Sequence, residues 1–167
     1  MKNKMLLLAA LLLLSVPAQA QWSIGGFVSF SHSWRNKTSD FSFKPDVSYG
    51  FGNVSVGASL ILERYSFYDE GRYDMYFGLA PYVQYYYWST GPLSLLVEGG
   101  VQFTRNIAPD SVYNRWEPYL TPGLEFSLSD HWSLVGYLGR LEYDSYSKTF
   151  RIGLDAASFT FGVYYGF

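Results

Sequence analysis

Residues 158–167, which read SFTFGVYYGF, decide how the rest of the chain is interpreted. Large apolar side chains occupy every second position of this stretch: Phe159, Phe161, Val163, Tyr165 and Phe167. Successive side chains of a β-strand point to opposite faces, so this alternation predicts a strand with one apolar face. In water, an apolar strand with a bare edge recruits other strands. A strand that closes a barrel inside lipid by pairing with the first strand has no bare edge.

The composition fits a barrel with lipid outside. Aromatic residues make up 20% of the chain and charged residues only 16%, whereas a soluble domain usually carries about 25% charged residues. The formal net charge of −2 argues against a nucleic-acid partner, which requires a basic surface. The chain has no cysteine, which excludes disulfides and a lipoprotein anchor. With two histidines and no cysteine, we expect neither a metal site nor a cofactor.

The N-terminal residues have the pattern of a secretory signal. Lys2 and Lys4 precede an apolar run at 5–14, and Ala18 and Ala20 form a small-x-small cleavage site. The apolar run is about half the ~20 residues that a membrane-spanning helix needs. We therefore expect residues 1–20 to be a signal peptide that directs export, and residues 21–167 to form one barrel domain.

Period-two alternation recurs along the whole of the remaining chain. It predicts eight strands, at residues 22–34, 41–49, 54–63, 75–87, 93–104, 116–128, 132–143 and 150–167. The connectors 35–40, 68–74 and 106–115 are long, and the connectors 50–53, 89–92 and 129–131 are short. An even strand number with alternating turns and loops is typical of an outer-membrane barrel, with both termini on the periplasmic side. The predicted fold is all-β, an eight-stranded antiparallel up-and-down transmembrane β-barrel.

Three features interrupt this pattern. The phase of the alternation changes near Gly139, which predicts a bulge there that turns Arg140 and Glu142 inward. A second phase slip lies at 155–157 in the last strand. Prolines fall inside predicted strands, where we expect further local bulges: Pro45, Pro81, Pro118 and Pro122.

The predicted apolar faces place aromatic residues in two belts, as at the two interfaces of a membrane barrel. The outer belt consists of Trp34, Phe41, Phe43, Phe77, Phe103, Trp116 and Phe150. The inner belt consists of Trp22, Tyr49, Tyr85, Tyr87, Phe126, Trp132, Tyr165 and Phe167. A soluble lipocalin-like barrel is the alternative, but its interior would be apolar. The faces opposite the apolar ones hold glycine, serine and charges, which favours the membrane barrel.

Those opposite faces predict a polar lumen. Its expected residues are Lys44, Asp46, Glu63, Gln84, Glu98, Gln102, Glu117, Glu125, Arg140 and Arg151. Eight strands leave a lumen that side chains can fill, and buried charges require partners. We therefore expect a structural network of ion pairs and hydrogen bonds. A narrow pore is the alternative, and the excess of acidic groups would make it prefer cations.

Several segments resemble the small bacterial outer-membrane β-barrel family, porin-like and OmpX/OmpA-like in architecture. They are FSFKPDVSYGFGNVSVGASL at 41–60, LAPYVQYYY at 79–87, LSLLVEGGVQF at 93–103, LTPGLEFSLSDHWSLVGYLG at 120–139 and GLDAASFTFGVYYGF at 153–167. The resemblance implies a multi-pass protein of a Gram-negative outer membrane, with a role in membrane integrity or in loop-mediated binding. It brings no catalytic residues. It also implies that Phe167 belongs to the signal read by the barrel-assembly machinery.

A binding or a catalytic role is the alternative to a purely structural one. The connector 106–115 is the best candidate for contacting an unknown surface ligand or lipopolysaccharide, with Arg105, Asp110, Tyr113, Arg115 and Trp116. A lipid A-modifying enzyme would need a nucleophile beside a base. His131 and Ser133 share a face but lie at a predicted periplasmic turn, and the adjacent His32 and Ser33 face opposite ways. We therefore expect no enzymatic activity.

Overall fold

The computed structural model describes residues 21–33, 38–67, 72–107, 112–153 and 159–167. Within them the chain forms strands β1 (Gln21–Ser33), β2 (Thr38–Phe51), β3 (Val54–Phe67), β4 (Arg72–Thr90), β5 (Leu93–Ile107), β6 (Val112–Ser127), β7 (Trp132–Leu138), β8 (Arg140–Asp144), β9 (Thr149–Gly153) and β10 (Phe159–Gly166). The predicted signal peptide 1–20, Trp34 and the slip at 155–157 lie outside the described residues. Among the described residues there is no helix long and apolar enough to cross a membrane.

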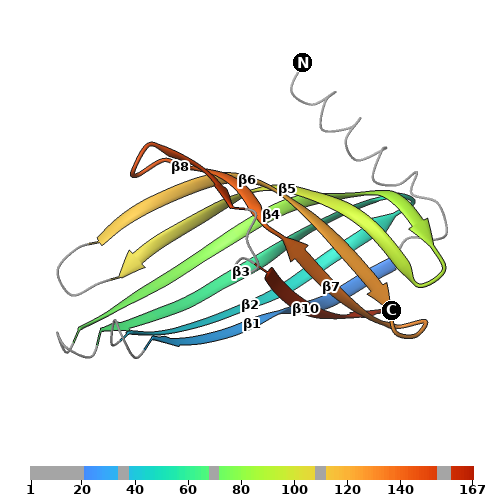
Figure 1. Cartoon of the computed structure of the whole chain (residues 1–167), viewed down its shortest axis with the longest axis horizontal. Helices are drawn as coiled ribbons and strands as arrows, with labels where there is room; N and C mark the ends of the chain where they lie inside the picture. Colours follow the sequence, from blue (N-terminus) through green and yellow to red (C-terminus); the bar gives the residue numbers. More distant parts are fainter. Residues whose placement is uncertain (1–20, 34–37, 68–71, 108–111, 154–158) are drawn as a thin grey trace, which may run out of the picture.

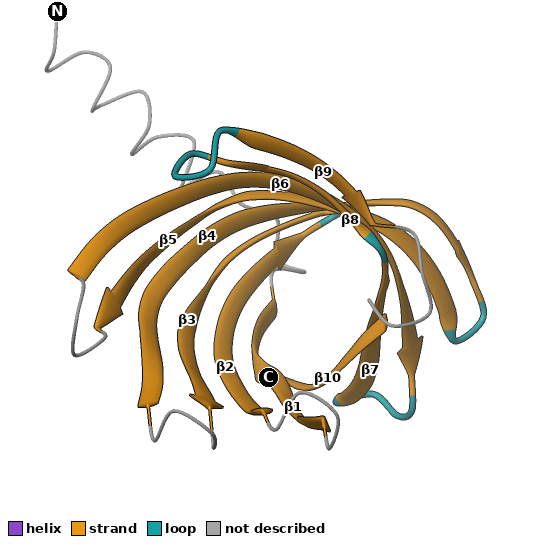
Figure 2. Cartoon of the chain, turned by 60° about the vertical axis from the view of Figure 1, so that its left-hand side comes forward, coloured by secondary structure: helices purple, strands orange, loops and turns teal. Residues whose placement is uncertain are grey.

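The strands close into an antiparallel barrel (Figures 1 and 2). Neighbouring strands from β1 to β7 pair in sequence order, and β10 pairs with both β7 and β1, which makes a ring of eight. The register between β10 and β1 runs from Ser23↔Gly166 to Phe27↔Gly162. The main-chain N–H of Phe167 also donates to the carbonyl oxygen of Trp22 at 2.9 Å. The predicted eight-stranded barrel, closed by its last strand on its first, is confirmed.

The seventh and eighth strands of the ring are each divided in two. β7 continues as β8, and β9 precedes β10; the hairpin β8–β9 lies toward one end of the barrel (Figure 1). Gly123 pairs with Tyr137, whereas Tyr119 pairs with Glu142, so one extra residue is inserted between the two pairs. Gly139 takes a φ of 76° at this point. The bulge expected near Gly139 is therefore present, and glycine accommodates its left-handed backbone.

The bulges expected at the prolines of the wall were wrong. The pairing of β2 with β3 skips Pro45, and that of β4 with β5 skips Pro81, but the register is the same on either side of each proline. A proline removes one ladder bond without requiring an extra residue. A register shift occurs instead between Tyr86 and Trp88, and both Tyr87 and Trp88 have exposed side chains.

The long connectors are shorter than expected. Thr38 and Asp40 belong to β2, Arg72 opens β4, and the predicted loop 106–115 lies in β5 and β6 except for residues 108–111. The apolar alternation fades where a strand leaves the bilayer, but main-chain pairing does not depend on apolar side chains and continues. Hydrophobic pattern therefore underestimates the length of the strands.

Candidate functional site

The barrel interior is built around Glu98 of β5. Its carboxylate accepts hydrogen bonds from Gln84 Nε2 at 3.0 Å, from the hydroxyl of Tyr119 at 2.8 Å and from the hydroxyl of Tyr137. Gln84 also donates to the Tyr137 oxygen at 2.8 Å. Glu98 is buried, and these donors supply the partners that a buried carboxylate requires.

A second buried acid lies beside this group. Asp46 of β2 accepts hydrogen bonds from the hydroxyl of Tyr82 at 2.7 Å and from Ser59 at 2.6 Å. Together, Asp46, Tyr82, Gln84, Glu98 and Tyr137 form what we call the plug. Apolar side chains pack with it: Phe27, Leu96, Val135 and Tyr164.

Glycine on neighbouring strands makes room for the rings. Tyr82 pairs with Gly57, Tyr119 with Gly100, and Tyr137 with Gly123. A methyl group added at Gly100 would lie 2.8 Å from the Tyr119 ring, and one at Gly123 would lie 2.8 Å from the Tyr137 ring. Each of these interior rings therefore fills the space that a glycine leaves on the neighbouring strand. A larger residue in place of the glycine would collide with the ring.

Two cavities lie inside the barrel. One of about 700 Å³ is lined by Glu98 and Tyr137 of the plug and by Lys44, Gln102 and Arg140. The other, of about 300 Å³, is lined by Gln84, Tyr86, Glu125 and Tyr164 near the tight turns. The lining residues of the two cavities do not overlap. We call them the outer and the inner cavity, following the predicted orientation.

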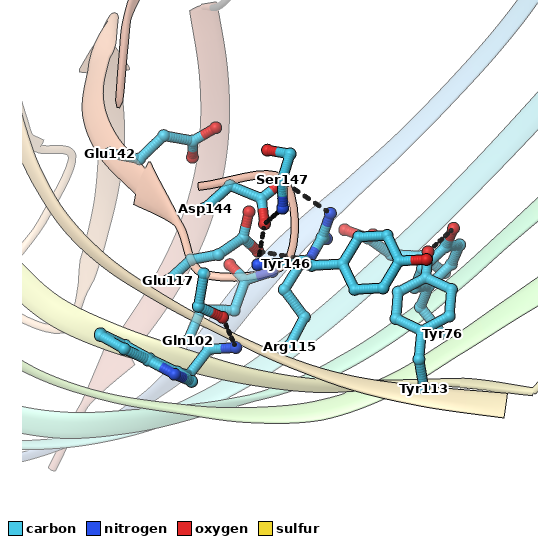
Figure 3. A network of polar contacts seen from close by, with 12 residues as sticks. Tyr76, Gln102, Tyr113, Arg115, Glu117, Glu142, Asp144, Tyr146 and Ser147 are labelled. Carbon is cyan, nitrogen blue, oxygen red and sulfur yellow. Dashed lines mark hydrogen bonds and ion pairs between the residues drawn. The ribbon is translucent and has the colours of Figure 1, made fainter. Parts of the chain in front are cut away.

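Ion pairs line the outer cavity of the lumen. Lys44 lies 2.7 Å from Glu63, and Arg140 lies 2.8 Å from Glu142 and 3.1 Å from Gln102. A further group of ion pairs lies within the hairpin β8–β9 and on the adjacent β6, and Arg115 connects the two at 3.9 Å from Asp144 (Figure 3). In it, Arg151 contacts Asp144 at 2.7 Å and Glu142 at 3.2 Å, and Arg115 contacts Glu117 at 3.0 Å.

The residues predicted for the lumen are largely brought together. Nine of them lie on inward-facing positions of β2 to β8, and they contact one another, interior tyrosines or, for Glu117, Arg115. The tenth, Arg151, lies on the hairpin with half of its side chain exposed. Glu125, for example, accepts from the Tyr86 hydroxyl at 2.7 Å. Arg115 was expected on an outer loop, but it lies in β6 and its guanidinium faces Glu117, Asp144 and the ring of Tyr76. It is two positions before Glu117, so the alternation itself could have placed it inside.

Other interior residues were not identified from the sequence. Tyr137 and Tyr164 are buried in the lumen, and Asp144 accepts main-chain N–H groups of Tyr146 and Ser147. Both tyrosines occupy inward positions of the period-two pattern, which was the available signal. Asp144 follows the Gly139 bulge. Whether its side chain faces the lumen or the lipid therefore depends on the extra residue of that bulge.

Some aromatic residues of the predicted belts are cross-strand neighbours of one another. The rings of Trp22 and Tyr49 lie 5.0 Å apart, and those of Trp132 and Tyr165 lie 5.1 Å apart. Phe103 pairs with Trp116 between β5 and β6. The belt side chains that are exposed on the outer wall include Phe41, Phe43, Phe77, Tyr85, Tyr87, Phe103, Trp116, Phe126, Trp132 and Phe150.

The candidate histidine has another partner. Nδ1 of His131 lies 3.0 Å from the carbonyl oxygen of Gly166, and its ring stacks on Tyr165 with centroids 5.5 Å apart. Ser133 lines the inner cavity. This arrangement ties the last tight turn to the end of β10, which is a structural use of the histidine.

The comparisons with known proteins agree with this architecture. In a search of the solved structures, the chain is similar to Neisserial surface protein A (NspA), with 14% identity, a TM-score of 0.57, and coverage of 89% of this chain and 96% of that one. A de novo designed transmembrane β-barrel is more distant, with 11% identity and a TM-score of 0.34 over 89% and 93% of the two chains. No curated protein matches in sequence. Residues 6–167 match the family model described as the outer membrane protein beta-barrel domain. The chain therefore belongs to the outer membrane protein β-barrel family and is an integral protein of the outer membrane.

Proposed function

We propose that this protein is a non-conducting outer-membrane barrel with a structural or ligand-binding role at the cell surface. The observation that carries the proposal is the plug. Glu98 and Asp46 hold donors from β3, β4, β6 and β7 across the lumen, between two cavities with different linings. An ion that crosses the barrel would have to break these buried hydrogen bonds. Each broken bond would leave a buried donor or acceptor without a partner.

The outer wall supports a contact with anionic lipid. Arg64 and Arg105 are exposed on outward positions of β3 and β5, and Arg64 lies over the ring of Tyr73 at 5.0 Å. Guanidinium groups bind phosphates well. We propose outer-membrane lipids and lipopolysaccharide as partners here, the barrel-assembly machinery as the partner of Phe167, and residues 1–20 as the export signal. We propose no enzymatic activity; an altered lipid A mass spectrum in a deletion strain would contradict this.

A cation-preferring pore is the competing function. It is favoured by the acidic groups that line both cavities, Glu98 and Glu142 in one and Glu125 in the other. In that case the plug would have to open.

Planar-bilayer recording of the folded barrel separates the two functions. We expect the native protein to give no channel events, and Tyr137→Ala to give small, cation-selective ones, because it removes a side chain that fills the lumen. Tyr143→Ala, outside the lumen on β8, is the control and should stay silent. Channel events from the native protein would overturn the closed lumen and establish the pore.

A further inference from the structure

The inner cavity has a largely polar lining that comes from the whole ring of strands. Each of the eight strands contributes at least one residue with a hydroxyl or a carboxyl group. In order around the ring, these residues are Ser23, Ser48, Ser55, Tyr86, Ser94, Glu125, Ser133 and Tyr164. The tight turns 52–53, 91–92 and 128–131 lie at this end of the barrel, and Gly52 and Asn53 are part of the lining. Convergent polar groups around a cavity are the means by which a protein orients a small ligand.

A bulge in β4 shapes this cavity. The inward alternation of β4 runs through Tyr86 and would next turn Trp88 into the lumen. One extra residue, Tyr87, is inserted here in the pairing with β5. Trp88 is therefore exposed and is not part of the lining, whereas Ser89 is, and its hydroxyl donates to that of Ser94 at 2.9 Å. Bulges often redirect a side chain beside a functional site, and this one exchanges a tryptophan for a serine in the cavity.

The inner cavity is negatively charged. Glu125 is the only charged residue among the described residues that line it. The lysines and arginines of the described ranges all lie in the outer half of the barrel: Lys44, Arg64, Arg72, Arg105, Arg115, Arg140, Lys148 and Arg151. A cleft lined by one sign of charge raises the local concentration of ions of the opposite sign. The inner cavity therefore favours a cation.

Glu125 is also the least satisfied acid of the lumen. Glu63, Glu117 and Glu142 each have a lysine or arginine nitrogen within 3.0 Å, and each carboxylate of the plug accepts at least two hydrogen bonds. Glu125 has no ion-pair partner in the part of the chain that the structure describes. Its described contact is the Tyr86 hydroxyl, which donates to Oε2 at 2.7 Å. Oε1 therefore remains available to a ligand.

The available groups fit an ammonium ion better than other cations. A guanidinium binds a carboxylate best through both oxygens, whereas an ammonium is a compact donor of three hydrogen bonds. No group of three histidine or acidic side chains suited to a metal ion occurs within the described ranges. The cavity volume of about 300 Å³ is at the lower limit of small-molecule sites, which span roughly 300–1,000 Å³. Val54, Val135 and the ring of Tyr86 supply an apolar part of the lining.

We propose that the inner cavity binds a small primary alkylammonium ion. Its nitrogen donates to Oε1 of Glu125 and to the hydroxyls of Ser94, which pairs with Glu125 across β5 and β6, and of Ser89. Its short hydrocarbon chain lies against Val135. This goes beyond the surface role proposed above, because the site lies at the opposite end of the barrel. The site needs only the inner side of the plug, so channel events would overturn the closed lumen and not this site.

The probe is butylammonium chloride, added at constant ionic strength to the folded, nitrogen-15-labelled barrel in zwitterionic micelles. We expect saturable shifts of the main-chain amide signals of Ser94, Glu125 and Ser133, and no saturable shift at Ser42, which lines the outer cavity. Butanol and butyrate, which are similar in size, should give no saturable shift. The proposal is overturned if butylammonium does not saturate these signals, if Ser42 responds equally, or if butanol or butyrate saturates them as readily.

A variant pair tests the role of the carboxylate. Glu125→Gln should raise the half-saturating concentration of butylammonium about tenfold, which corresponds to about 1.4 kcal/mol. Asp130→Asn is the matched control, because it removes an acid from the adjacent tight turn that is not part of the lining, and it should leave this concentration unchanged. An equal effect of both variants would overturn the contact with Glu125. Magnesium chloride that saturates the same signals at a lower concentration would overturn the assignment to an organic cation.

A second pair tests the space that the bulge provides. Ser89→Trp returns a large ring to the cavity and should abolish the saturable shifts at Glu125 and Ser133. Thr90→Trp is the control, because Thr90 is exposed and is not part of the lining. If Ser89→Trp does not fold, Ser94→Leu fills the same part of the cavity from β5. Unchanged binding of butylammonium in the folded variant would overturn the proposed position of the ligand.

Discussion

The ring of Tyr82 occupies the space that a side chain on Gly57 would need. The two residues face each other on β4 and β3, and a methyl group on Gly57 would lie 2.5 Å from both Cζ and the hydroxyl oxygen of Tyr82. Phe27 faces Gly162 in the same way, with 2.7 Å between the added methyl group and the ring. The hydroxyl of Tyr82 is thereby positioned on Asp46. The plug thus depends on the glycines of the wall.

We expect Gly57→Ala to destabilise the barrel by about 1–3 kcal/mol, the usual cost of overpacking an interior. The Tyr82 ring cannot retreat without losing its bond to Asp46. Unfolding by guanidinium in detergent micelles, followed by tryptophan fluorescence, measures the change.

Gly99→Ala is the matched control, because Gly99 is also on a strand and its nearest neighbour, a side-chain carbon of Leu120, would lie 3.4 Å from the added methyl group. We expect little change there. A Gly57 variant as stable as the Gly99 variant would show that the ring adapts without cost.

The sequence predicted the barrel better than it predicted the interior. Strand number and closure follow from the alternation of apolar side chains, since lipid must contact one face of every strand. The predicted position of Arg115 is wrong because a charged stretch between apolar runs is typical of a loop, whereas main-chain pairing here continues through it in β6. The pairing of Tyr82 with Gly57 depends on register between strands, which the local pattern of one strand does not contain.

The second prediction concerns the stability of a variant at the buried carboxylate of Glu98. Its two carboxylate oxygens accept from three donors, and Oε2 receives both Gln84 and Tyr137. In Glu98→Gln, one oxygen becomes an amide N–H₂, so at least one donor loses its acceptor. An unsatisfied buried group costs about 1–3 kcal/mol, and the same unfolding assay should show a loss of this order. Glu125→Gln is the control: the described partner of Glu125 is the Tyr86 hydroxyl, which can still donate to an amide oxygen.

Arg115 is expected to hold the hairpin β8–β9 on the barrel. It lies 3.9 Å from Asp144, next to the stacked rings of Tyr113 and Tyr146, whose centroids are 4.4 Å apart (Figure 3). Lys148, in the turn of the hairpin, is exposed and has a φ of 53°. Arg115→Ala should weaken the attachment by about 0.5–1 kcal/mol, so trypsin should cleave after Lys148 about two- to fivefold faster if cleavage follows local opening.

The control for this measurement is Arg105→Ala, which removes one arginine from an exposed outward position of β5. Its cleavage rate at Lys148 should equal that of the native protein. An unchanged rate in Arg115→Ala would mean that other bonds hold the hairpin without Arg115, such as the main-chain bond from Ser145 N–H to the Trp116 carbonyl oxygen and the bond from Trp116 N–H to Ser145 Oγ.

The orientation of the barrel can be tested with single cysteines. Ser147 and Ser129 are exposed, and they lie in the hairpin turn of β8–β9 and in the tight turn before β7. If the tight turns face the periplasm, a membrane-impermeant maleimide added to intact cells should label Ser147→Cys and leave Ser129→Cys unlabelled until the outer membrane is permeabilised. The reverse pattern would invert the predicted topology and place the outer cavity toward the periplasm.

Phe167 is expected to act mainly during assembly. Its ring contacts Tyr165 with centroids 5.1 Å apart, but its side chain is largely exposed, so its contribution to the folded barrel is small. Phe167→Ala keeps the main-chain bond to Trp22 and should lower the fraction of protein that migrates as heat-modifiable barrel in cell membranes. Once folded, the Phe167→Ala barrel should have the same free energy of unfolding as the Phe126→Ala barrel. Phe126, an outward aromatic residue in mid-chain, serves as the control position. An equal loss of assembly in both variants, or a loss of stability confined to Phe167→Ala, would assign Phe167 to the wall and not to recognition by the assembly machinery.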